Sequence, residues 1–262
     1  MSPKKKDAKI LPFVTPKKFT LGLPVGTQAF QTFLIVGEPP GLESSSKRKM
    51  IAAGEAEVEA EREHRGEPDK ALPKEKKKIW LPEELAELST YPTNDGRFYH
   101  PAMAFLSAAL DGLWAARAIY PNERESASNI LARSLDVRQM QCILVDPVTH
   151  KAFRWGKKKD ILHPPYVITL ATPVNNITGF SILNWQAVWP KWATFVTFCY
   201  DPMQASPESI LQALELGGRL VAVGGFRKLS TKRSKRGKGG PFGKYIPYLW
   251  NRAIPQDAIP EV

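Results

Sequence analysis

The chain has 262 residues, of which 43% are hydrophobic and 10% aromatic, so its composition supports a packed core of one large or two small domains. It has a formal charge of +11 and no uncharged apolar run of about 18 residues, which excludes a membrane-spanning helix. The N-terminus lacks the apolar segment of a signal peptide, and two cysteines are too few for a disulfide scaffold. We therefore expect a cytoplasmic protein with reduced cysteines and no membrane partner. The four scattered histidines show no metal-ligand spacing, so we expect no metal and no other cofactor.

The N-terminal third contains one predicted strand and a long interruption. Residues 1–26 are rich in Pro and Lys and are expected to form a basic, extended arm. The β-branched and aromatic sequence of 27–37 predicts a strand. Residues 38–78 contain almost no large apolar side chains, which predicts an exposed, flexible insertion.

The middle of the chain is predicted to alternate helix and strand. Apolar residues at helical spacing predict a helix from Ala102 to Tyr120, preceded by Pro101. Residues 126–134 are expected to add a helical turn. Strands are predicted at 137–145 and 166–174, with 151–155 as a hairpin partner. We interpret 146–190 as an elaboration between the two halves of the domain.

The last hundred residues have the clearest pattern. Residues 191–200 predict a strand, with Trp192, Val196 and Phe198 on one face. Ser206 and Pro207 are typical of a helix start, and Gly217 and Gly218 of a helix stop. Strands are then predicted at 219–224 and 242–249, on either side of a glycine-rich basic loop, and 251–262 is expected to be a tail.

This order predicts an α+β protein with a ferredoxin-like, RRM-like β-α-β-β-α-β fold. The single domain would span 27–250, with the insertion at 38–78 and the basic loop near its C-terminal end.

The positive charge is concentrated in one segment. Residues 216–256 include ten Lys and Arg and no acidic residue, whereas the rest of the chain has 27 basic and 26 acidic residues. A solubilising loop would also be basic, but a field of one sign favours a polyanion site, most often a phosphate backbone. Glycines let backbone amides approach a phosphate, and aromatic rings can stack on bases. The predicted contacts are Phe226, Arg227, Lys228, Lys232, Arg233, Lys235, Arg236, Lys238, Phe242, Lys244 and Tyr245.

Two further features are candidate sites. The run Lys157, Lys158 and Lys159 is a second possible phosphate contact, although charge runs in hairpins are often only solvated. His100, next to the predicted helix start, could act as acid or base in a metal-independent ribonuclease. A third alternative is a structural subunit whose basic loop docks on an acidic protein. We expect no catalytic residue and treat His100 as the enzymatic alternative.

The sequence Asp95-Gly96-Arg97-Phe98-Tyr99-His100-Pro101-Ala102 resembles the turn before a helix in the RAMP superfamily, the ferredoxin-like RNA-binding proteins of CRISPR effector complexes. Residues 224–243 resemble the glycine-rich loop of that family. The ending Gly240-Pro241-Phe242-Gly243-Lys244-Tyr245 is similar to phage-encoded proteins, which implies a phage-encoded protein in a bacterial cell. The resemblance implies non-catalytic binding to single-stranded DNA or RNA, as a homo-oligomer or as a subunit of a nucleoprotein complex.

Overall fold

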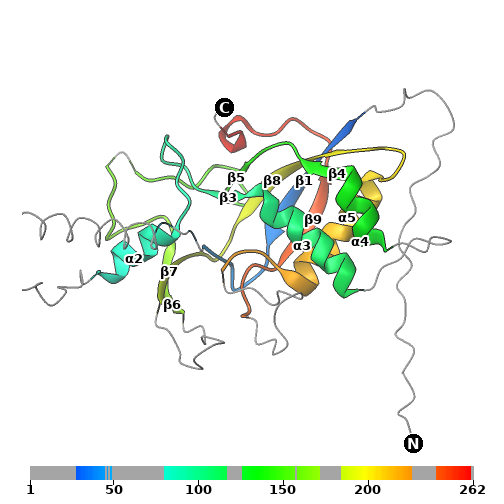
Figure 1. Ribbon diagram of the computed structural model, residues 1–262. Coiled ribbons are helices and arrows are strands. Elements are labelled where there is room, and N and C mark those ends of the chain that lie inside the picture. Colours follow the sequence, from blue (N-terminus) through cyan, green and yellow to red (C-terminus); the bar gives the residue numbers. More distant parts are fainter. Residues whose placement is uncertain are drawn as a thin grey trace, which may run out of the picture.

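A computed structural model describes residues 28–44, 46, 48, 80–116, 126–156, 158–171, 184–225 and 240–260 (Figure 1). It is a mixed α and β structure with antiparallel sheets. Its elements in chain order are β1 (Ala29–Gly37), β2 (Leu42–Glu43), α2 (Pro82–Ser89), β3 (Tyr99–Pro101), α3 (Ala102–Ala115), α4 (Ala127–Ser134), β4 (Leu135–Val137), β5 (Gln141–Ile143), β6 (Val167–Ala171), β7 (Asn184–Trp189), β8 (Ala193–Tyr200), α5 (Pro207–Leu216), the π-helical turn η1 (Gly217–Val221), β9 (Tyr245–Trp250) and the 3-10 turn η2 (Gln256–Ala258).

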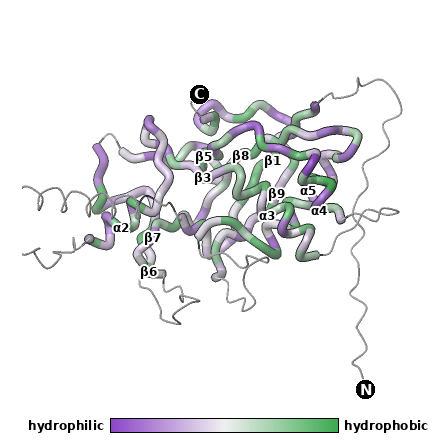
Figure 2. Tube along the Cα trace, viewed as in Figure 1, coloured by the Kyte–Doolittle hydropathy of each residue, from purple (hydrophilic) through white to green (hydrophobic). Residues whose placement is uncertain are grey.

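The main sheet has the strand order β4-β8-β1-β9, and every neighbouring pair is antiparallel. Helices α3 and α5 pack against each other and cover one face of it (Figure 1). Alternate residues of the strands, such as Phe33 on β1 and Val196 on β8, meet Phe105 and Leu113 of α3 in the core. Hydrophobic stretches run along β1, β8 and α3 (Figure 2). The strands predicted at 27–37 and 191–200 are therefore confirmed within a residue or two, and the predicted helix begins at Ala102 as expected. Helix α3 ends at Ala115, and residues 117–120 of the predicted helix lie outside the described residues.

Helix α5 begins where the sequence predicted, but it does not stop at Gly217. Ser206 accepts a hydrogen bond from the Ser209 amide (3.2 Å), with Pro207 at the first helical position. At the other end the chain continues as the π-helical turn η1, so the strand predicted at 219–224 is wrong. A Cβ on Gly217 would lie 2.7 Å from the backbone of Ala108. This glycine therefore permits close contact with α3 instead of ending the helix.

In place of one long strand at 137–145, the chain forms two short strands in different sheets, β4 ending at Val137 and β5 at Gln141–Ile143. Strand β4 lies beside β8, whereas β5 pairs with β3. Between them, the Gln139 amide donates to the Phe195 carbonyl (2.6 Å) and accepts from the Thr197 amide (3.3 Å). A side chain thus takes over hydrogen bonds that a continuous strand would have made with its backbone.

A second sheet, of order β2-β7-β6, lies beside α2 (Figure 1). Strand β2 corrects the expectation that 38–78 is exposed from its start, because Leu42, Glu43 and Ser44 are buried. They follow the turn closed by Gly41, whose amide donates to the Glu38 carbonyl (3.0 Å), and this turn directs Leu42 into the core. Residues 49–78 of the predicted insertion lie outside the described residues, as do 1–26 of the predicted arm.

Candidate nucleic-acid interface

The basic loop emerges from a structure that we call the neck, formed by residues 222–225 and 240–244 together with the turn 38–44. The Val223 amide donates to the Gly243 carbonyl (3.0 Å), which joins the two ends of the loop. The Gly243 amide donates to Gly41 (2.7 Å) and the Gly225 amide to Glu43 (3.0 Å), which ties both ends to the turn. Backbone hydrogen bonds therefore hold Val223, Gly225 and Gly243 beside the turn 38–44, just before the start of β9.

Glycine is required at two neck positions. Gly243 has a φ of +74°, and a Cβ there would lie 1.6 Å from the Val223 carbonyl oxygen. Gly224 has a φ of +90°, and its Cβ would lie 2.5 Å from the Glu43 carbonyl oxygen. Residues with side chains rarely adopt such a φ. The amides of Gly225 and Gly243 donate to protein carbonyls, so these two glycine amides shape the neck and are not directed at a phosphate.

The structure describes three of the ten basic residues between 216 and 256. Arg219 and Arg252 are exposed, and Lys244 is half-buried at the neck. The other seven basic residues and Phe226, one of the three aromatic residues predicted to stack on bases, lie outside the described residues: Phe226, Arg227, Lys228, Lys232, Arg233, Lys235, Arg236 and Lys238. The described chain thus shows where the loop begins and ends.

The two other aromatic residues predicted to stack on bases differ in their surroundings. Tyr245 is buried, with its ring 5.7 Å from Phe105 in an edge-to-face contact, and burial raises the pKa of its hydroxyl. The ring belongs to the core and offers no face to a base, because the first residue of β9 points toward the helices. Phe242 is half-buried at the neck.

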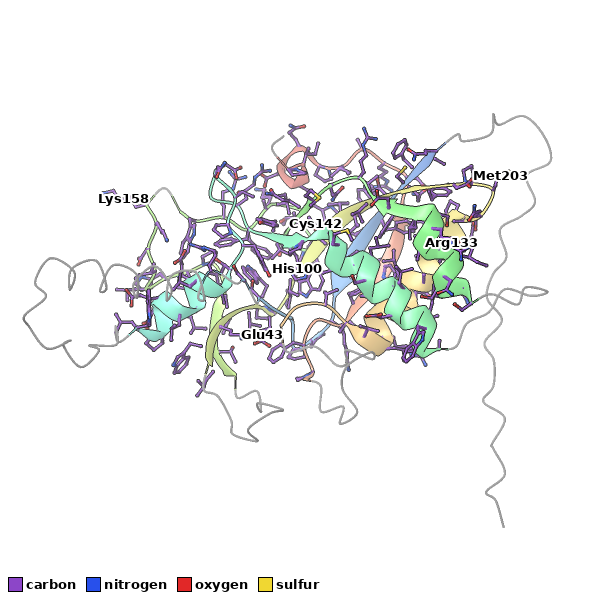
Figure 3. The ribbon with its side chains drawn as sticks, in the orientation of Figure 1. Glu43, His100, Arg133, Cys142, Lys158 and Met203 are labelled. Carbon is purple, nitrogen blue, oxygen red and sulfur yellow. The ribbon has the colours of Figure 1, made fainter. Side chains whose placement is uncertain are left out.

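The lysine run at 157–159 is partly neutralised. Lys159 Nζ lies 3.0 Å from Glu87 Oε1 and 5.7 Å from the centre of the Trp155 ring. Arg48 also pairs with Glu87, at 3.1 Å. Lys158 is exposed and extends away from the body (Figure 3), and Lys157 lies outside the described residues. Lys158 is therefore the described member of this run that is placed for an external phosphate.

His100 lies in β3, inside the protein (Figure 3). The residue is 3% exposed, and its ring meets Tyr91 at 6.0 Å and Phe105 at 5.6 Å, both edge-on. The helix that follows begins at Ala102, with Pro101 at its cap. A phosphodiester would reach this imidazole only if the surrounding rings moved.

The face of the main sheet opposite helices α3 and α5, which we call the free face, carries aromatic residues that the sequence interpretation missed. Phe30 on β1 and Tyr248 on β9 are about half exposed, at 51% and 50%. Both occupy positions that alternate with core residues, so period-two alternation within 29–37 and 245–250 could have placed them opposite the helices. Whether anything covers that face depends on residues distant in the sequence.

In the part of the chain that the structure describes, no cluster of His, Cys, Asp or Glu has the composition of a metal site. No described helix combines the length and apolar character needed to cross a bilayer. Cys142 and Cys199 are both free thiols.

No family model matches the sequence, and no curated protein is similar to it. The arrangement of this chain's own residues therefore carries the functional assignment.

Proposed function

We propose that this protein binds single-stranded nucleic acid without cleaving it, gripping phosphates with the basic loop. The observation that carries the proposal is the charge of residues 216–256, with ten basic and no acidic residues. Lys and Arg that neutralise phosphates release counterions, and this supplies most of the sequence-independent affinity for nucleic acid.

The neck supports this proposal because it concentrates the charge. Seven basic residues lie in the fourteen residues between Gly225 and Gly240, and backbone hydrogen bonds tie Gly225 and Gly243, on either side of this loop, to the same turn. Of the two acidic residues in the neck, Glu43 is buried, and its backbone carbonyl accepts the hydrogen bond of the Gly225 amide. The two ends of the basic loop are therefore anchored to the same turn.

We also propose that the main sheet and its helices form a ferredoxin-like unit. Support comes from the chain order β1, α3, β4, β8, α5, β9 together with the strand order β4-β8-β1-β9. With the resemblance to the RAMP superfamily, this favours a non-catalytic subunit that repeats along a strand in the cytoplasm. The burial of His100 favours binding over cleavage.

The test compares two variants of equal charge change by fluorescence anisotropy with labelled oligo(dT) and oligo(U). In the loop variant, Lys232, Arg233 and Lys235 become Gln. In the control variant, Arg133, Lys151 and Lys191, exposed and outside the loop, become Gln. If about five phosphates are neutralised, the wild-type plot of log affinity against log salt has a slope of about −3.5. The slope of the loop variant should be shallower by about 2 units, and the slope of the control variant should be almost unchanged.

A flat salt response of the wild type, or equal losses in the two variants, would contradict the proposal. The same samples report cleavage when EDTA is present, so shortened RNA would identify the ribonuclease instead. An oligomer that nuclease treatment leaves unchanged, with no oligonucleotide bound, would favour docking on a protein.

A further inference from the structure

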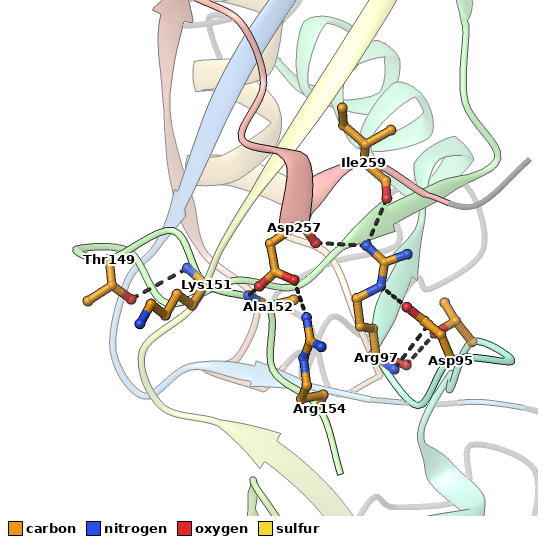
Figure 4. A network of polar contacts seen from close by, with 9 residues as sticks. Asp95, Arg97, Thr149, Lys151, Ala152, Arg154, Asp257 and Ile259 are labelled. Carbon is orange, nitrogen blue, oxygen red and sulfur yellow. Dashed lines mark hydrogen bonds and ion pairs between the residues drawn. The ribbon is translucent and has the colours of Figure 1, made fainter. Parts of the chain in front are cut away.

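Among the residues that the structure describes, the free face of the main sheet has a covered half and an open half. Residues 254–260, which we call the C-terminal strap, lie over the covered half, where Ala258 and Ile254 pack against Leu34 and Phe195. Arg97 holds the strap by donating from Nη1 to the carbonyls of Asp257 and Ile259, both at 2.8 Å (Figure 4).

The Asp257 side chain adds a second anchor for the strap. Its carboxylate accepts a hydrogen bond from the Ala152 amide (2.6 Å) and pairs with Arg154 (Figure 4). Asp257 therefore ties the strap to the segment that contains Ala152 and Arg154, which fixes the position of the strap on the sheet.

The open half of the face presents Tyr248 and Phe30. Tyr248 on β9 pairs with Leu34 on β1. Phe30 lies four residues before Leu34 on β1 and pairs with Cys199 on β8. Four residues of a strand span about 13 Å, so the two rings are too far apart to sandwich one base and can each stack on a different one. Trp250, beside Thr32, lies between them in the register and packs on Phe195 with ring centres 5.0 Å apart.

Two guanidinium groups accompany this row of rings. Arg138 lies 4.7 Å from the centre of the Phe30 ring, and Arg252 lies 5.9 Å from that of Trp250. A guanidinium against an aromatic face is stabilised by the ring electrons and keeps its hydrogen-bond donors free for a phosphate. The carboxylate of Asp136 is also on this face, opposite Cys199. Alternating rings and arginines fit a ligand that alternates flat bases and phosphates better than they fit an apolar protein surface.

We propose that the open half of the sheet, with Phe30 and Tyr248 as stacking residues and Arg138 and Arg252 as phosphate contacts, binds the unpaired bases of a nucleic-acid strand. This inference rests on the proposed function. It adds a base-binding surface to the phosphate-binding loop. The two surfaces are continuous in the chain, because β9 starts directly at the neck and carries Tyr248 on the open half.

The test uses Phe30→Ala and Tyr248→Ala, with Trp114→Ala as the matched control. Trp114 is an aromatic residue of similar exposure, 49%, on helix α3. The probes are oligo(dT) and oligo(U) of about 20 nucleotides and an abasic deoxyribose-phosphate strand of equal length. Each stacking variant should bind the base-bearing strands about tenfold more weakly and the abasic strand as the wild type does. Trp114→Ala should change the affinity for neither kind of strand. Phe30→Tyr, which keeps an aromatic ring, should bind the base-bearing strands as the wild type does, in contrast to Phe30→Ala.

The salt dependence separates this inference from the proposed function. Stacking variants should keep the wild-type slope, because they remove no positive charge, whereas the loop variant lowers it. If the wild type binds oligonucleotides and both alanine variants bind equally well, the inference is overturned and the proposed function stands. A wild type that binds no oligonucleotide overturns both. If the alanine variants dissociate an oligomer but bind oligonucleotides normally, the surface is a protein interface and the inference is wrong.

Discussion

The two faces of the main sheet use the same residue types for different purposes. Phe33 and Phe30 are three residues apart on β1, yet Phe33 is fully buried and Phe30 is 51% exposed. The Phe33 ring packs edge-on against Phe198 (5.9 Å) in the core under the helices. Phe30 has only Arg138 over its ring among the described aromatic and cation contacts. A phenylalanine in this sheet therefore stabilises the fold or offers a ring to a ligand, depending on the face it occupies.

The difference has a structural cause. The helix face is covered by α3 and α5, which arise from the strongest apolar patterns in the sequence. Among the described residues, the other face is covered in part by the C-terminal strap and by the segment 143–152, whose Val145 and His150 pack beside Phe195. Large exposed apolar groups on a folded protein often mark an interaction site. Within the described chain, the strap and the segment 143–152 therefore limit how much of the aromatic surface is exposed.

The largest expected effect comes from replacing these two phenylalanines. Phe33→Ala removes a fully buried ring and should lower the free energy of unfolding by about 3–5 kcal/mol. Phe30→Ala removes a half-exposed ring and one exposed cation–π contact, and should cost less than about 1 kcal/mol. Denaturant unfolding followed by circular dichroism measures both. Equal losses would show that the face containing Phe30 is covered in solution, which would contradict the comparison.

Sequence patterns predicted the elements of this sheet better than its surfaces. The strand at 191–200 and the start of α5 were predictable because alternation and capping are local signals. The segment at 219–224 was not, because Gly217 is needed for contact with α3, which is distant in the sequence. The split of 137–145 depends on the Gln139 side chain bonding to β8, which no local pattern contains.

The candidate site shows the same limit. The charge of the basic loop is a matter of composition and could be counted from the sequence. The neck could not be predicted, since it needs Gly41 and Glu43 beside Gly225 and Gly243, some two hundred residues later. Tyr245 was expected to stack on bases, but its place at the start of β9 turns it toward the core. Alternation shows which residues share a face, while the cover of that face comes from other parts of the chain.

A smaller effect is expected at the end of the sheet, where the neck joins β9. Gly243→Ala places a Cβ against the Val223 carbonyl at a positive φ, and should destabilise the fold by about 1–3 kcal/mol. Gly156→Ala is the matched control, because the nearest atom to its Cβ would be 3.7 Å away. Thermal unfolding measures both. If Gly243→Ala is as stable as Gly156→Ala, the hydrogen bonds of the neck do not hold the loop ends together.

The smallest effect concerns the two cysteines, which also divide between covered and open surroundings. Cys142 is fully buried, and burial raises the pKa of its thiol to about 12 from an ordinary value of 9.0. The unfolded chain ionises first, so the stability that the neutral thiol contributes is complete below pH 9 and is lost as the pH rises toward 12. Between pH 8 and about pH 10, the free energy of unfolding of Cys142→Ala should therefore fall by about 1 kcal/mol less than that of the wild type. Denaturant unfolding at each pH measures this difference. Tyr166 and Tyr245, whose pKa values are also raised by burial, contribute equally in both proteins, so the difference isolates this thiol. Burial also raises the pKa of the half-buried Cys199 thiol, so Cys199→Ala should differ from the wild-type profile in the same direction but less than Cys142→Ala does. Identical pH profiles of Cys142→Ala and the wild type would show that Cys142 reaches solvent.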